Sequence, residues 1–133
     1  MKGTFKSEQE PILGTGEFIL GIVSASDSKT KDHLPKANMS LVVLGGPKAG
    51  KHIKHFAIFY PDHHHRKWIT DRFLGAIGVE RDEETGEYNY DTDNWTGRKF
   101  VAGIEEGEYN GEPQNKINRV RALKEGEVDG APF

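Results

Sequence analysis

The chain has 133 residues, the size of one domain, and contains no cysteine, which excludes disulfides and thiolate metal sites. Its formal net charge of -3 at pH 7 is not that of a uniformly basic nucleic-acid-binding protein. No apolar run approaches the roughly 18 residues that a membrane-spanning helix needs, and the N-terminal residues lack the apolar core of a signal peptide. We therefore expect a soluble cytoplasmic protein without a membrane partner.

The charge is unevenly distributed along the chain. Residues 80–93 contain seven acids and one base, and residues 125–133 contain three acids and no base. The remaining residues hold 17 of the 18 bases and 11 of the 21 acids, so a moderately basic body carries two acidic segments. This distribution is compatible with an anionic partner, which the net charge alone would argue against.

The first half of the chain predicts three strands. Residues 1–15 are polar and interrupted by proline and glycine, which predicts a loosely held leader. The polar stretch 26–36 predicts a loop, and the Gly/Pro-rich stretch 45–51 predicts the turn of a hairpin. β-Branched and aromatic residues predict strands at 16–25, 37–44 and 52–60.

A helix is predicted next, over residues 63–77. Apolar residues recur there at spacings of three and four, as on the buried face of a helix. Asp62 is a candidate N-cap, and Gly78 follows the last apolar residue as a helix-ending glycine does.

Two further strands are predicted after the acidic stretch, at 98–106 and 114–123. The dipeptide Asn110-Gly111 between them is a strong signal of a two-residue hairpin turn. The closing residues 125–133 are acidic and have few apolar side chains, which predicts a disordered tail.

Three strands, one helix and two strands is the element order of the OB-fold, a five-stranded, partly open barrel whose sheet face binds oligonucleotides. The predicted fold class is therefore mainly β with one helix, in one OB-fold-like domain over residues 16–124. Other small α+β domains share this element order.

The three consecutive histidines are the candidate metal site. His63, His64 and His65 could supply ligands, but consecutive residues at a helix start point about 100° apart, so only one or two could share an ion. The i, i+4 spacing of metal-binding helices is absent, as are a nucleophile elbow, a P-loop and a dinucleotide fingerprint. We therefore expect no catalytic residue, metal or cofactor, and keep a histidine-centred metal-dependent enzyme as a lesser alternative.

Basic residues interleaved with aromatics are more informative, because binding a single strand needs cations for the phosphates and flat rings for the bases. Alternation on the third strand predicts Lys54, Phe56 and Tyr60 on one side. For Trp95 and the turn-flanking tyrosines, structural packing is the alternative to base stacking. The predicted nucleic-acid-binding residues are Lys48, Lys51, Lys54, Phe56, Tyr60, Trp95, Lys99, Tyr109, Lys116, Asn118, Arg119 and Arg121.

A small family of bacteriophage-encoded proteins resembles this chain in three segments, GGPKAGKHIKHFAIFYPD, ITDRFLGAIG and WTGRKFVAGIEEGEYNGEPQNKINRV. The shared features are a Gly-rich hairpin, here residues 45–51, and a short helix ending in Leu/Ile-Gly, here 74–78. The third is a final hairpin of the form Glu-x-Tyr-Asn-Gly followed by Asn-Lys-Ile, which reads EYNGEPQNKI at 108–117 here, without the residue between Glu and Tyr. Members of this family lie among phage replication and recombination genes and are regarded as OB-fold-like single-stranded-DNA-binding proteins. The resemblance implies the same fold and ligand here.

The last residues, EVDGAPF, resemble the acidic tail of bacterial single-stranded-DNA-binding proteins. That tail ends in Pro-Phe and docks on partner enzymes through its terminal ring and carboxylate. The resemblance implies that Pro132 and Phe133 bind a partner protein, with Glu127 and Asp129 as the acidic approach. A tail of this kind can also compete with DNA for a basic groove.

Together, these features predict a non-catalytic single-stranded-DNA-binding protein that acts in phage DNA replication or recombination in the cytoplasm of the host cell. Its expected partners are single-stranded DNA and, through the tail, phage or host replication and recombination proteins. A strand edge could also mediate a homodimer. A phage protein-interaction module without nucleic-acid binding is the main alternative.

Overall fold

The strands and the helix follow one another in the predicted order in the computed structural model, which describes residues 1–5 and 10–127. The protein is mainly β with one helix, as expected. The elements are β1 (Gly16–Lys29), β2 (Pro35–Val43), β3 (His52–Ile58), α1 (Lys67–Ala76), β4 (Lys99–Tyr109) and β5 (Glu112–Arg121), with two short 3-10 turns at Gly46–Lys48 and Thr92–Asn94.

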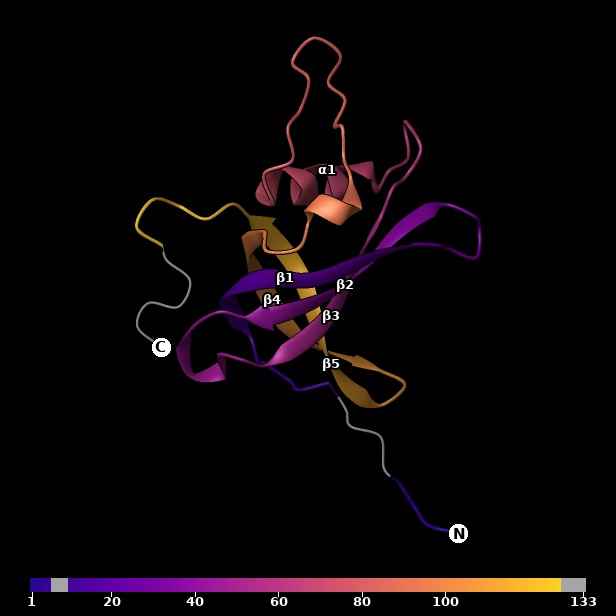
Figure 1. Ribbon diagram of the computed structural model, residues 1–133, viewed down its shortest axis with the longest axis vertical. Coiled ribbons are helices and arrows are strands. Elements are labelled where there is room, and N and C mark those ends of the chain that lie inside the picture. Colours follow the sequence, from indigo (N-terminus) through magenta and orange to yellow (C-terminus); the bar gives the residue numbers. More distant parts are fainter. Residues whose placement is uncertain (6–9, 128–133) are drawn as a thin grey trace.

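The five strands form one antiparallel sheet in the order β3-β2-β1-β4-β5. A bulge in β1 between Ile22 and Ser24 shifts the register, and such bulges bend a strand. In Figure 1, β4 and β5 pass behind β1, β2 and β3 at a steep angle, so the sheet curls. The arrangement is OB-like, and among the described residues no ladder closes the sheet between its free edges, β3 and β5.

The core lies inside the curl of the sheet and under α1. Alternate residues of β2, from Ala37 to Val43, are buried, and Phe100 on β4 is fully buried with them. The helix adds Phe73 and Leu74, and it contacts both β3 and β5. It therefore covers one end of the open side of the sheet.

The residues before β1 are part of the fold, so the predicted loosely held leader is wrong for residues 10–13. Leu13 is 4% exposed and belongs to the core, and its main-chain N–H donates to Asn115 Oδ1 on β5 at 2.9 Å. Asn115 Nδ2 in turn donates to the Pro11 carbonyl at 2.8 Å. The folded domain therefore begins before Gly16.

The helix is shorter than the predicted range 63–77, because α1 begins at Lys67. His63 has a positive φ of 66°, which is incompatible with a right-handed helix, so the chain turns at the histidines before the helix starts. Asp62 is not the N-cap; its carboxylate accepts from Lys67 Nζ at 2.7 Å. No helix within the described residues is long and apolar enough to cross a membrane.

Candidate nucleic-acid interface

The outer face of β1, β2 and β3 carries polar side chains in register. Because side chains alternate between the two faces of a sheet, the neighbours of the buried β2 residues point outward. Two adjacent rows cross the three strands, Ser24 with Ser40 and Lys54, and Ser26 with Asn38 and Phe56. Hydroxyl, amide, ammonium and aromatic groups therefore lie close together on one surface.

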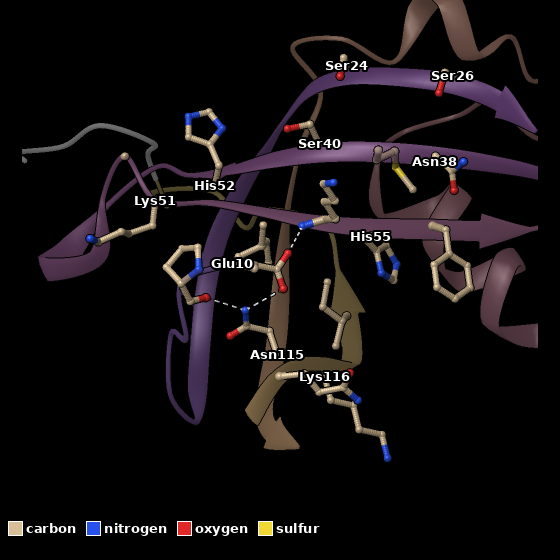
Figure 2. A pocket seen from close by; sticks show the side chains of 18 residues that line it. Glu10, Ser24, Ser26, Asn38, Ser40, Lys51, His52, His55, Asn115 and Lys116 are labelled. Atoms are coloured by element: carbon tan, nitrogen blue, oxygen red, sulfur yellow. Dashed lines mark hydrogen bonds between the residues drawn. The ribbon is translucent and has the colours of Figure 1, made fainter. Parts of the chain in front are cut away.

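These rows line a groove of about 1410 Å³. Figure 2 shows Asn38 and the serines on β1 and β2, with Asn115 and Lys116 across the groove on β5. Lys51 and Lys54 line it from the β3 side, and Glu10 lies between β3 and β5. The groove therefore runs from the outer face of the sheet into the gap between its free edges.

Phe56 is an exposed aromatic residue within this groove. Its side chain is 53% exposed although it lies within β3. Lys36 Nζ lies over the ring, 5.5 Å from its centroid, which is a cation–π distance. An exposed ring beside cations is an arrangement that can stack a nucleobase.

His55 precedes Phe56 on β3 and points into the gap towards β5, as Figure 2 shows. Its ring centroid lies 5.6 Å from that of Phe73, and burial lowers the pKa of His55 to about 4. The imidazole is therefore neutral at pH 7 and adds no positive charge to the groove.

Four of the residues predicted from the sequence meet in the groove, Lys51, Lys54, Phe56 and Lys116. Two exposed ones lie outside its lining. Lys48 is in the Gly46–Lys48 turn, and Tyr109, 68% exposed, is at the end of β4.

Four more predicted residues do not line the groove either. Tyr60 stacks on His64 with ring centroids 4.4 Å apart, and Lys99 is half-buried on β4. Asn118 lies at the register shift between β4 and β5. Arg119 lies opposite Gly103, and its side chain packs so closely that a Cβ added at Gly103 would come within 2.8 Å of Arg119 Nε.

Trp95 is a correction to the sequence analysis, because it cannot stack a base. The side chain is 0% exposed and packs against Phe73, with ring centroids 5.9 Å apart, and against Phe59 at 6.3 Å. Its Nε1 is buried without a hydrogen-bond partner. Trp95 is a core residue, and the packing alternative is the correct one.

Arg121 does not line the groove, and it forms ion pairs within the chain. Its Nη1 donates to Glu127 Oε1 at 2.7 Å, and its Nη2 donates to Glu127 Oε2 at 2.9 Å and to Glu17 Oε1 at 3.4 Å. The hydrogen bonds that Arg121 donates to Glu127 and Glu17 raise the pKa of Arg121, and the same bonds to Glu127 lower the pKa of Glu127 to about 2. Arg121 is therefore not a free cation for phosphates.

Glu127 is the one predicted tail residue that the structure describes, and it contacts the domain through Arg121. Asp129, Pro132 and Phe133, which were predicted to bind a partner protein, lie outside the described residues.

Sequence reasoning missed the uncharged polar residues of the groove. Asn38 and Ser40 alternate with buried Met39 and Leu41, and this two-residue period is a signal that could have found them. Asn115 had no such signal, because its role depends on the N-terminal segment that it binds.

Two of the three histidines, His64 and His65, stack on each other in the turn before α1. His64 lies against both Tyr60 and His65, with ring centroids 4.4 and 4.6 Å apart, and its Nδ1 accepts from the Arg66 main-chain N–H at 3.0 Å. Within residues 1–5 and 10–127, no group of three or more His, Cys, Asp or Glu side chains is arranged to hold a metal ion.

No protein-family model matches the chain, and no curated protein matches it significantly.

Proposed function

We propose that this protein binds single-stranded DNA without catalysing a reaction. The observation that carries the proposal is the groove, in which exposed Phe56 lies beside hydrogen-bonding side chains and three lysines. An OB-fold binds oligonucleotides on the face formed by its second and third strands, which is where this groove lies. A flat ring for bases and cations for phosphates are the requirements of sequence-tolerant single-strand binding.

The geometry supports a simple mode of binding. A base stacks on Phe56, and Asn38 and Ser26, in the same row across the sheet, offer hydrogen bonds to its edge. Lys54 and Lys116 lie on the two sides of the groove and neutralise phosphates. Because paired bases of a duplex do not expose their faces, single strands are favoured.

The biological setting rests on the resemblances. The final hairpin, residues 108–117, supports a role in phage DNA replication or recombination, which takes place in the cytoplasm of the host cell. The end of the chain supports recruitment of a replication or recombination protein through Pro132 and Phe133.

Fluorescence anisotropy with a labelled oligo-dT tests the proposal. We expect binding at low salt that weakens as salt is added, because the lysines displace counterions from the phosphates, and weaker binding of a duplex of equal length. Phe56→Ala should weaken binding by about 1 to 3 kcal/mol, or roughly five- to 150-fold in Kd, because one stacked base is lost.

Trp68→Ala is the matched control for Phe56→Ala. Trp68 is 56% exposed, close to the 53% of Phe56, but it lies on α1 and does not line the groove. Its variant should bind oligo-dT as the unmodified protein does. An equal loss in both variants would contradict the assigned groove, and no binding at low salt would favour a protein-interaction module.

A further inference from the structure

Glu10 is an internal anion in the groove. Its Oε1 accepts from the Lys54 main-chain N–H at 2.5 Å, and its Oε2 accepts from Asn115 Nδ2 at 3.2 Å. Figure 2 shows this carboxylate between β3 and β5 with both hydrogen bonds. One carboxylate therefore bridges the two free edges of the sheet.

The two donors are held in place by the fold. The Lys54 N–H belongs to the backbone of β3, and Asn115 is oriented by two further hydrogen bonds, from the Leu13 N–H to its Oδ1 and from its Nδ2 to the Pro11 carbonyl. Phosphate oxygens accept the same kind of hydrogen bond as carboxylate oxygens, and main-chain N–H groups are common phosphate contacts. This pair of donors is therefore suited to a phosphate.

The charges around Glu10 favour exchange with a phosphate. Among the described residues that line the groove, Glu10 is the only acid, and Lys51, Lys54 and Lys116 line it as well. A strand of DNA that follows the lysines brings its phosphates to the carboxylate, and two anions at one site repel each other. Glu10 is exposed and precedes β1, so it can leave without breaking a strand.

We propose that the Lys54 main-chain amide and the Asn115 side-chain amide form a phosphate-binding site, which Glu10 occupies until a phosphate of the bound strand replaces it. This inference rests on the proposed function of the groove and adds to it a contact and an internal competitor. Binding of DNA then includes the displacement of Glu10, so the apparent affinity is lower than the groove alone would give.

The Kd of the Glu10→Ala and Glu10→Gln variants for oligo-dT at low salt tests whether Glu10 competes with a DNA phosphate. We expect Kd to fall at least about fivefold for Glu10→Ala, because the site no longer has to be vacated. Glu10→Gln, which keeps an oxygen acceptor for the Lys54 N–H, should show a fall in the same direction and guards against a folding defect in the alanine variant.

Glu83→Gln is the charge-matched control, since Glu83 is an exposed acid between α1 and β4 and does not line the groove. Its Kd should change less than about twofold. Equal changes in Kd for the Glu10→Gln and Glu83→Gln variants would overturn the proposal that Glu10 competes with a phosphate. Such a result would leave only an effect of net charge.

A titration with inorganic phosphate separates this site from the proposed function. The Lys54 amide signal in the ¹⁵N–¹H NMR spectrum should move at lower phosphate concentrations in Glu10→Ala than in the unmodified protein. The same response in both proteins, or none in either, would overturn the site. The expected phosphate response together with no binding of oligo-dT would instead overturn DNA binding and leave an anion site.

Discussion

His55 is a histidine held in its neutral form beside the groove. Burial lowers its pKa to about 4, whereas the ordinary histidine value of 6.5 applies to the unfolded chain. Because the unfolded chain binds the proton more readily, the free energy of unfolding falls as the pH drops from about 6.5 towards 4. We expect His55 to remove about 2 kcal/mol of stability between about pH 7 and about pH 5.

Urea unfolding at these two pH values measures the effect. His55→Leu removes the titrating ring, so its stability should depend less on pH by about 2 kcal/mol over this range. If His55→Leu kept the pH dependence of the unmodified protein, the charging of His55 would not be its cause.

Some side-chain positions could be predicted from the sequence because they depend on local periodicity. Lys54 and Phe56 point outward from β3 as the two-residue alternation predicts. Trp95 and Arg121 depend on distant partners instead. Rings from the helix and from the segment after β3 enclose Trp95, and Arg121 meets Glu17, which lies 104 residues earlier.

The hairpin between β4 and β5 is closed by the two residues that the sequence predicted. Tyr109 pairs with Glu112, and Asn110 and Gly111 between them have φ values of 51° and 80°. A type I′ turn requires positive φ at both positions. Gly111→Ala should therefore lower the free energy of unfolding by about 1 kcal/mol, because a Cβ is strained at positive φ.

Gly111→Asn is the matched variant for this turn, because asparagine tolerates positive φ better than alanine does. Its loss of stability in urea unfolding should be smaller than that of Gly111→Ala. Equal losses would show that φ at position 111 does not determine the effect.

The lengths of β1 and β2 could not be predicted from hydrophobic alternation. β1 continues to Lys29, and β2 begins at Pro35 and pairs with it. Both strands therefore extend into residues 26–36, which were predicted as a loop. Both faces of the sheet are polar here, so no apolar period marks the strands. Their main-chain pairing, for example of Ser28 with Lys36, extends beyond the core.

At the scale of the whole molecule, residues 10–13 connect the two edges of the sheet and contribute to its core. Leu13→Ala should lower the free energy of unfolding by about 2 to 5 kcal/mol, because it leaves a cavity beside buried residues. Ile12→Ala, at a half-buried neighbour, should cost less. Urea unfolding of both variants measures the difference, and a small loss for Leu13→Ala would mean that the N-terminal segment is not needed for the fold.

The element order and the fold class were predictable, because each strand and the helix has its own local pattern. The means of covering the open side of the sheet was not. The N-terminal segment is held there by a contact between Leu13 and Asn115, which are 102 residues apart, and Leu13 is buried. The mostly polar composition of residues 1–15 gives no sign that their single leucine is buried.

The contact between Leu13 and Asn115 also sets a delay during protein synthesis. A ribosome adds roughly 5 to 20 residues per second, so roughly 5 to 20 s pass between the synthesis of these two residues. In that interval β1, β2 and β3 can already pair, because their ladders join neighbours in the sequence. Glu10 then lacks its β5 partner, and the half-made chain presents the edge of β3 to neighbouring nascent chains.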